Sequence, residues 1–257
     1  MGSFPEWRHV AVRQDGGVTE LRLHSDDGPL RWNARIHREL VEAFSAVGLD
    51  TDTKAVILTG TGDSFCTDID VESFRGSTDG WDVIWWEGRR MLTGLVDIDV
   101  PVITVVNGPV TIHSELAVMA DIVLACPQAS FADHAHFTRG IVPGDGVHFV
   151  WTELLGPTRG RWFLLTGSTI DAREALRVGV VHELLESDDL QTRAWSLARQ
   201  IASQPLPVLR YTRAVLGMDW RKRLGDSVSH GLAVEGLAQY ALGRVPLPPP
   251  DDPHEQA

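Results

Sequence analysis

Hydrophobic and polar residues follow two different spacings in the first half of the chain. Residues 9–24 alternate between apolar and polar positions on both sides of Asp15-Gly16-Gly17, and this pattern predicts two strands joined by a tight turn. Residues 54–60 and 100–108 are continuous apolar runs. Runs of this length are typical of strands that are buried on both faces of a sheet.

Shorter apolar runs follow, and helical patterns lie between them. Further strands are expected at residues 121–126 and 129–133, and helices at residues 35–47, 82–97 and 113–120. A strand followed by a helix, several times over, predicts right-handed βαβ units and therefore an α/β fold.

The pattern becomes mainly helical from about residue 157 and stays so to residue 243. We therefore expect a core over residues 1–195 and a C-terminal helical region over residues 196–244. The Pro-rich, acidic end at residues 245–257 is expected to be disordered.

Composition narrows the class of protein. The chain has 257 residues, of which 43% are hydrophobic and 23% charged, as in an ordinary globular domain. Its net charge of −12 argues against a nucleic-acid surface, because phosphate binding needs clustered Lys and Arg. No apolar run reaches the ~20 residues that span a bilayer, and the first residues lack the apolar region of a secretory signal. Cys66 and Cys126 form no metal-binding spacing. We expect a cytoplasmic enzyme without nucleic-acid or membrane partners.

One turn-rich segment concentrates groups that can transfer protons. Residues 130–151 hold His134, His136 and His148, with Asp133 and Asp145 among them. Three interpretations are open: a metal site, an acid–base site, or solvated loop residues. His134 and His136 would face one way on a strand, but no HExxH-type spacing is present, so no metal is expected.

Several stretches together resemble the crotonase (enoyl-CoA hydratase/isomerase) superfamily. They are residues 54–74, 100–125, 130–146 and 160–185, followed by the helical end. The resemblance implies a spiral of ββα units and a C-terminal helical trimerisation region. It also implies a homotrimer or a dimer of trimers.

The chain departs from the usual pattern of that superfamily at its reaction centre. The usual FCAGAD reads FCTDID at residues 65–70, and the usual Gly-rich turn reads TIHSEL at residues 111–116. By register, the family's two backbone N–H donors to a thioester oxyanion would fall near Ile69 and Ile112. Glu115 occupies the position of the first hydratase glutamate, but His136 occupies that of the second. The resemblance therefore implies that the hydratase pair is broken.

These departures resemble one branch, the β-diketone hydrolases typified by 6-oxocamphor hydrolase, which cleave carbon–carbon bonds without coenzyme A or another cofactor. The likeness implies that His136 is the base and Asp145 its acidic partner, and that His113 and Trp32 bind a substrate carbonyl. The remaining matched positions are two further polar pocket residues, His37 and Glu235, and an apolar wall residue, Phe74. Trp85 and Trp86 are expected to add to that wall.

This set suits a retro-Claisen reaction. Water adds to one carbonyl of a 1,3-diketone, and the bond to the central carbon breaks because the other carbonyl stabilises the enolate. Histidine exchanges protons near neutral pH, an acid fixes its tautomer, and N–H donors hold the spectator oxygen. The expected partner is a small cyclic or bicyclic diketone, and the product a keto acid.

Other interpretations stay open. The chain could be a CoA-thioester hydratase, isomerase or hydrolase, a non-catalytic crotonase-like protein, or an enzyme that uses the same dyad on another intermediate. Each residue also has an ordinary structural interpretation. His136 could be a satisfied core histidine, Asp145 a turn residue, His113 a helix cap, Trp32 a core residue and Glu235 a paired surface acid. Glu115 is expected to be structural.

Overall fold

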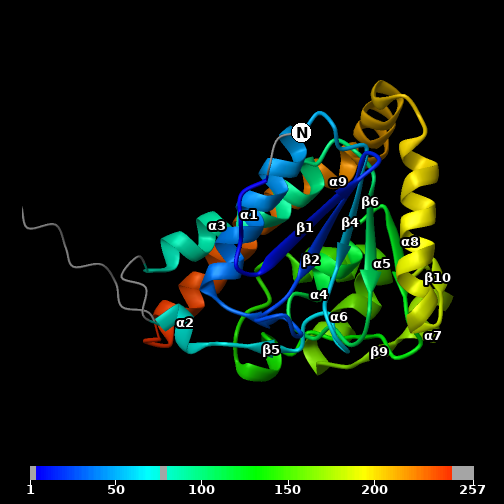
Figure 1. Ribbon diagram of the computed structural model, residues 1–257. Helices are drawn as coiled ribbons and strands as arrows, with labels where there is room; N and C mark the ends of the chain where they lie inside the picture. Colours follow the sequence, from blue (N-terminus) through cyan, green and yellow to red (C-terminus); the bar gives the residue numbers. More distant parts are fainter. Residues whose placement is uncertain (1–3, 76–79, 245–257) are drawn as a thin grey trace, which may run out of the picture.

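A six-stranded sheet carries the fold, with strand order β1-β2-β4-β6-β7-β10 (Figure 1). The computed structural model describes residues 4–75 and 80–244. Only the β1–β2 pair is antiparallel, and the other neighbours run parallel. The expected α/β class is therefore confirmed. The strands are β1 (Val10–Asp15), β2 (Val18–Leu23), β4 (Ala55–Thr59), β6 (Val102–Val106), β7 (Ile122–Ala125) and β10 (Glu183–Leu184).

The hairpin at the sheet edge forms as the alternation predicts. Gly16 and Gly17 both have positive φ, 58° and 82°. A two-residue turn of this hand matches the twist of the strands it joins, and only residues such as glycine adopt it without strain.

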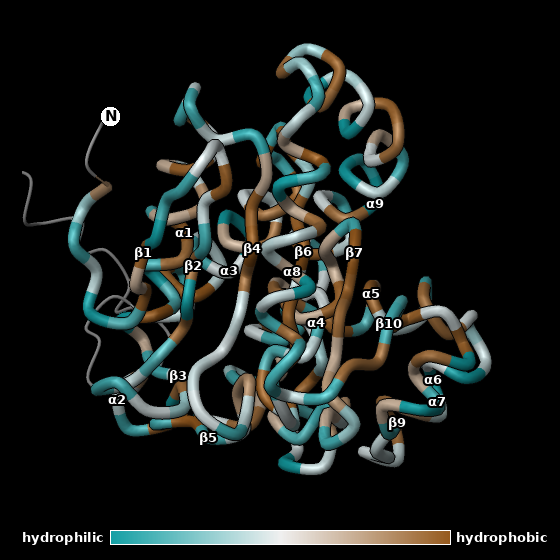
Figure 2. Tube along the Cα trace, turned by 45° about the vertical axis from the view of Figure 1, so that its right-hand side comes forward, coloured by the Kyte–Doolittle hydropathy of each residue, from teal (hydrophilic) through white to brown (hydrophobic). Residues whose placement is uncertain are grey.

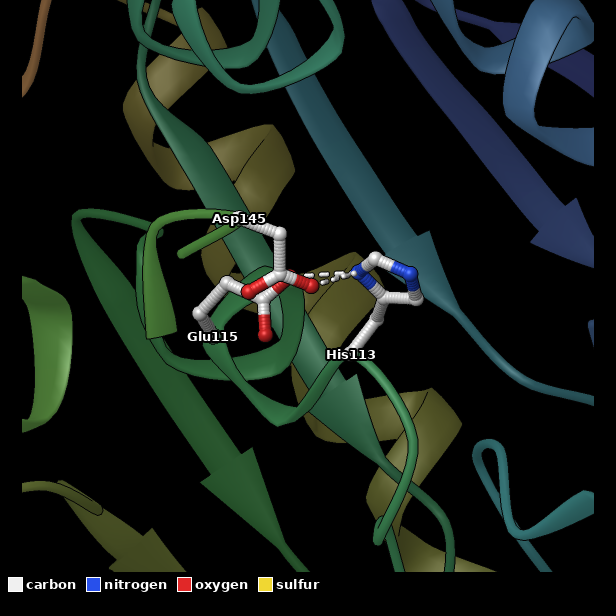
Figure 3. Close-up of side chains that lie close together, drawn as sticks. All are labelled: His113, Glu115 and Asp145. Carbon is white, nitrogen blue, oxygen red and sulfur yellow. Dashed lines mark hydrogen bonds and ion pairs between the residues drawn. The ribbon is translucent and has the colours of Figure 1, made fainter. Parts of the chain in front are cut away.

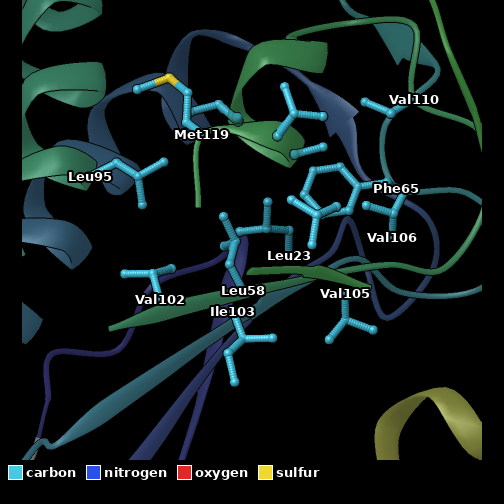
Figure 4. Close-up of a cluster of buried hydrophobic side chains, with 14 of the residues drawn as sticks. Leu23, Leu58, Phe65, Leu95, Val102, Ile103, Val105, Val106, Val110 and Met119 are labelled. Carbon is cyan, nitrogen blue, oxygen red and sulfur yellow. The ribbon is translucent and has the colours of Figure 1, made fainter. Parts of the chain in front are cut away.

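The central strands form the core. Every residue of β4 and β6 is buried, as their continuous apolar runs predict. Figure 4 shows Leu58 of β4 and Ile103 of β6 within this packed cluster. The hydrophobic colouring in Figure 2 is likewise concentrated on β4, β6 and β7.

Short strands form a second layer beyond the ends of the long ones. β3 (Arg31–Trp32) pairs with β5 (Asp68–Ile69), and β8 (Ser130–Phe131) pairs with β9 (Ile170–Asp171). Val110 connects the two pairs, because it bridges to Cys66 on one side and to Phe131 on the other. A long strand, a short strand and a helix thus follow one another repeatedly, which confirms the expected ββα spiral.

Helices cover both faces of the sheet. α8 packs along β2, β4, β6 and β7, while α1 packs on α3 and α3 on α9 (Figure 1). The helices are α1 (Ala34–Leu49), α2 (Glu72–Arg75), α3 (Gly80–Asp97), α4 (Ser114–Val118), α5 (Val147–Leu155), α6 (Pro157–Thr166), α7 (Ala172–Arg177), α8 (Ser187–Ala202) and α9 (Leu206–Ala241), with a 3-10 turn η1 at Phe137–Arg139.

The C-terminal part is built on two long helices. α8 runs through residue 195, the expected boundary between core and helical region, and that division stays a prediction. α9 is a single helix of 36 residues. No helix in the described ranges is long and apolar enough to cross a bilayer. The expected disordered end at 245–257 lies outside the described residues.

Candidate active site

Two neighbouring segments of the second layer position His113 and His136. Val110 accepts a hydrogen bond from the Ala132 N–H at 3.1 Å, and Thr111 accepts one from the His134 N–H at 3.0 Å. The chain leading to His113 is therefore paired with the chain leading to His136. Backbone pairing of this kind holds the two segments at the spacing of adjacent strands.

His113 has an unusual backbone conformation for its size. Its φ and ψ are 49° and 47°, the left-handed region that favours glycine and costs another residue ~1–2 kcal/mol. The ring stacks on the indole of Trp32, with centroids 3.9 Å apart. Its Nδ1 lies 2.7 Å from Oε1 of the buried Glu115. These contacts hold a bulky residue in a backbone conformation that glycine adopts without strain.

Asp145 joins the two histidines. Its Oδ2 lies 3.2 Å from Nε2 of His136 and 3.4 Å from Nδ1 of His113. Figure 3 shows the Asp145 and Glu115 carboxyl groups on the same side of the His113 ring, while the other ring nitrogen faces away from both. One nitrogen of His113 is thus left free of these acids.

Helix α9 fixes the loop that carries Asp145. Gly144 and Gly231 approach so closely that a Cβ on either glycine would clash with the backbone of the other. Glu235, one turn further along α9, accepts the Gly144 N–H at Oε2 over 3.2 Å. The loop of the acid partner is therefore positioned by two residues of α9, Gly231 and Glu235, that lie more than 80 residues further along the chain.

The charges in this cluster favour a protonated His136. Burial acts to lower its pKa, but the charge of Asp145 and the hydrogen bonds with Asp133 and Asp145 outweigh burial, and the pKa of His136 lies well above its usual value. The same partnership holds the pKa of Asp145 below its ordinary range despite burial. For His113, too, burial is outweighed by the charge of Glu115 and the pKa is raised.

Two buried glutamates have raised pKa values, in contrast to Asp145. Burial and the nearby Asp145 charge raise the pKa of Glu115, which is 0% exposed. Burial likewise raises the pKa of Glu235 to about 8. Removal from water disfavours the charged form of an acid, so Glu235 tends to be neutral near pH 7.

His37 belongs to an aromatic group beside the histidine pair. Its ring centroid lies 6.0 Å from Trp32 and 6.4 Å from Phe74, and both contacts are edge-on. Its Nδ1 lies 3.2 Å from Oε2 of Glu87. Burial lowers the pKa of His37 in spite of that contact, which favours the neutral ring.

The structure thus brings most of the predicted site residues together. Ring contacts connect Trp32, His37, Phe74 and His113, while Asp145 connects His113 to His136. Glu235 is connected to this group through its hydrogen bond with the Gly144 N–H. These placements leave the assigned roles as predictions.

The two predicted backbone donors are occupied. The Ile112 N–H donates to the carbonyl of Cys66 at 3.3 Å. The Ile69 N–H donates to Oδ1 of Asp68 at 2.8 Å. In this arrangement neither donor is directed only at a substrate, and their role as oxyanion donors stays a prediction.

Sequence reasoning assigned no role to Asp133. Its Oδ1 lies 2.8 Å from Nδ1 of His136, so His136 has a carboxyl group at each ring nitrogen. A local signal was present, because Asp133 precedes His136 by three residues in the same loop. Trp86 was expected in the wall, but it is 44% exposed and lies under the Arg90 guanidinium; its side chain is therefore at the surface.

A metal site was one of the open interpretations of the histidine-rich segment at residues 130–151. Among the described residues, His113, Glu115 and Asp145 offer ligand atoms within 4.8 Å of one another. The same nitrogen of His113 that would bind a metal already lies at hydrogen-bond distance from Glu115, and Asp145 is paired with His136. A cation there would displace these contacts.

Comparison with known proteins places this chain in a family. The enoyl-CoA hydratase/isomerase family model matches residues 14–230, so the chain belongs to the enoyl-CoA hydratase/isomerase (crotonase) family. It is similar to the solved structure of a β-diketone hydrolase from the cyanobacterium Anabaena sp., bound to (S)-3-oxocyclohexyl acetic acid. That likeness has 40% identity and a TM-score of 0.89, and covers 92% of this chain and 96% of the other.

Other relatives are named as enzymes that act on enoyl-CoA thioesters. An enoyl-CoA hydratase/isomerase structure from Mycobacterium paratuberculosis is 25% identical, with a TM-score of 0.82, covering 90% of this chain and 93% of the other. Enoyl-CoA delta isomerase 2 of Rattus norvegicus is 24% identical over 229 residues. That match covers 87% of this chain but 58% of the rat protein. Family membership alone therefore leaves the substrate undecided.

Proposed function

We propose that this enzyme hydrolyses a carbon–carbon bond of a cyclic or bicyclic β-diketone to give a keto acid. The observation that carries the proposal is the meeting of His113 and His136 on one oxygen of Asp145. His136 occupies the position of the second hydratase glutamate, so the proton-transfer group is an imidazole rather than a pair of carboxylates.

In the proposed reaction, His113 and Trp32 bind the carbonyl that is not attacked. The His113 nitrogen that faces away from Glu115 and Asp145 is available to donate a hydrogen bond to that oxygen. Stacking on Trp32 fixes the ring, and a donor held in place before the reaction stabilises charge as it develops.

The proton transfers belong to the pair of His136 and Asp145. A water molecule that enters between Nε2 and Oδ2 gives a proton to Nε2, and the hydroxide adds to the second carbonyl carbon. The tetrahedral intermediate breaks its bond to the central carbon, whose electron pair becomes the enolate. His136 then returns its proton to that carbon, so the sum is diketone plus water giving one keto acid.

Because both ring nitrogens of His136 face carboxyl groups, the base role requires that Nε2 exchange Asp145 for water. The protonated ring that the raised pKa of His136 favours corresponds to the state that follows proton removal from water. It is therefore also the state that protonates the enolate carbon.

The related Anabaena structure suggests a substrate class. Its bound acid carries a CH2–COOH arm on a ring ketone. Joining the acid carbon to the ketone's α-carbon across the ring gives an octane-2,6-dione whose bridgeheads are connected by three two-carbon bridges. Apolar rings such as Trp32 and Phe74 beside the histidines suit a compact hydrocarbon cage of this kind.

A CoA-thioester hydratase or isomerase is the second candidate. The observation in its favour is Glu115, which occupies the first hydratase glutamate position, is completely buried and contacts His113. The names of the curated relatives point the same way.

Mass spectrometry separates the two candidates. The purified chain is incubated in parallel with the bicyclic dione and with a panel of enoyl-CoA thioesters, with His136→Ala as the matched control. We expect the dione to gain the mass of one water in the wild type only. Turnover of thioesters alone would overturn the proposal.

A further inference from the structure

We propose that Asp133 is a positioning residue for His136: it holds the Nδ1–H of the imidazole, so that Nε2 is the nitrogen that exchanges protons with water and substrate. This inference rests on the proposed hydrolase function for its role in turnover. The structural part, a fixed Nδ1–H tautomer, can be measured without any substrate.

Each of the two acids lies beside a different ring nitrogen of His136. Oδ1 of Asp133 lies 2.8 Å from Nδ1 of His136, whereas Oδ2 of Asp145 lies 3.2 Å from Nε2. In hydrolytic triads the acid that orients the imidazole binds Nδ1–H and leaves Nε2 for proton transfer. Asp133 occupies that orienting position, and Asp145 occupies the position where the reacting water must enter.

Asp133 is buried and has few hydrogen-bond partners besides His136. The side chain is 2% exposed, and Oδ2 has no hydrogen-bond partner within the described part of the chain. Oδ1 also accepts the Ala135 N–H over 3.3 Å. A buried carboxylate with so few donors needs a nearby cation, and the His136 ring is the group in contact with it.

Asp133 and Asp145 are held in different ways. Asp133 lies two residues after the end of β8. The residues on either side of it, Ala132 and His134, donate backbone hydrogen bonds to Val110 and Thr111. Asp145 lies instead in the loop before α5 and shares its Oδ2 between two histidines. The acid assigned to Nδ1–H is therefore on the paired segment. The acid that water displaces from Nε2 is on the loop that α9 contacts.

Several titratable groups surround His136 on the elements packed against it, so a change in its charge state must be assigned by variants. These groups are Asp133 after β8, Asp145 before α5, His113 before α4, His148 in α5 and Glu235 in α9.

The direct test is NMR of the 15N-histidine-labelled full chain. His136 is assigned by its loss in His136→Ala, and its ring nitrogens are followed against pH in the wild type, Asp133→Asn, Asp145→Asn and Asp171→Asn. Asp171 caps α7 through the Glu174 N–H, a position where Asn is nearly equivalent. It controls for the substitution itself.

In the wild type we expect the His136 Nδ1 to stay protonated when Nε2 loses its proton. In Asp133→Asn we expect the His136 titration midpoint to fall by about one unit or more and the fixed tautomer to be lost. Asp145→Asn should lower the midpoint but keep the Nδ1–H, and Asp171→Asn should change neither. A wild-type His136 with Nε2–H as its neutral tautomer would overturn the inference, whether or not any variant folds.

Kinetics with the bicyclic dione supply the second readout. We expect Asp133→Asn to lower kcat by about 10²-fold or more, with little change in KM and with the acid limb of the pH–rate profile moved to lower pH. A merely structural role would lower the thermal midpoint and leave the limb in place. If the wild type does not turn over the dione, the proposed function fails, and the NMR result still decides the role of Asp133.

Discussion

The imidazole of His113 stacks on the indole of Trp32, with ring centroids 3.9 Å apart and an interplanar angle of 32°. The contact places an apolar face under a histidine whose backbone is in the left-handed region. An imidazole packed against an indole cannot turn freely, so its hydrogen-bonding direction is set before a substrate binds. Preorganisation of this kind is what makes a carbonyl donor effective.

His113→Ala should therefore reduce both substrate binding and turnover of the dione. Loss of one such donor costs about 10²–10³-fold in kcat, and we expect KM to rise as well because the spectator carbonyl is bound in the ground state. Trp32→Phe keeps the aromatic stack but removes the indole N–H, so its loss should be smaller. Equal effects of the two variants on steady-state kinetics would contradict a donor role for the imidazole.

Asp145→Asn and Glu115→Gln should behave very differently. Asp145→Asn removes the charge beside Nε2 of His136 and should lower kcat about 10²–10⁴-fold. Glu115→Gln should have little effect, because Glu115 faces Nδ1 of His113, away from the nitrogen proposed to bind the substrate, and Gln keeps an acceptor oxygen at that place. A near-normal Asp145→Asn alongside an inactive Glu115→Gln would return the site to hydratase-like chemistry.

Glu235 should make stability fall as pH rises above the pKa of an ordinary glutamate. Its pKa in the folded chain is about 8, above the usual ~4.3 of an unfolded glutamate. The folded state therefore binds a proton that the unfolded state lacks between these values, and this stabilisation is lost as pH rises toward 8. Glu235→Gln should gain thermal stability relative to the wild type between pH 5 and pH 8 in paired thermal melts. If the difference in melting temperature between Glu235→Gln and the wild type stayed constant across that range, a neutral Glu235 in the folded chain would be excluded.

Gly231→Ala should loosen the loop that carries Asp145. A Cβ at residue 231 would clash with Gly144, so we expect a loss of stability of about 1–3 kcal/mol together with lower activity. Gly225→Ala is the matched control on the same helix, because a Cβ there meets no described atom within 4 Å. It should be neutral or stabilising by up to ~1 kcal/mol. Chemical denaturation of both variants checks the contrast.

The N-terminal half of α9 is expected to pack against other copies of the chain. Val208, Tyr211, Val215 and Met218 recur at helical spacing and are all exposed, Val215 to 73%. Val215→Asp should shift the chain from a trimer or hexamer toward smaller species in light scattering, whereas Ser196→Asp on α8 should not. A monomeric wild type at micromolar concentration would contradict the expected assembly.

The strands and helices were largely predictable because their signals are local. The apolar runs of β4 and β6 and the turn at Gly16-Gly17 depend only on neighbouring residues. The site was predictable only through resemblance, since Trp32 and Glu235 are about 200 residues apart. The role of Asp133 was missed because its pairing with His136 depends on side-chain direction in an irregular loop, which no periodicity encodes. The partnership of His37 with Glu87 was missed for the same reason.

The Val110 bridges have a consequence for how such an enzyme can diverge. Because the segments that carry His113 and His136 are hydrogen-bonded neighbours, the separation of the two imidazoles is set by strand spacing and not by loop length. An insertion or deletion in the Gly-rich loop at 140–146 would move Asp145 and leave the histidine pair in register. Changes of specificity that arise by altering loop length are therefore expected to shift the acid relative to a constant pair of histidines.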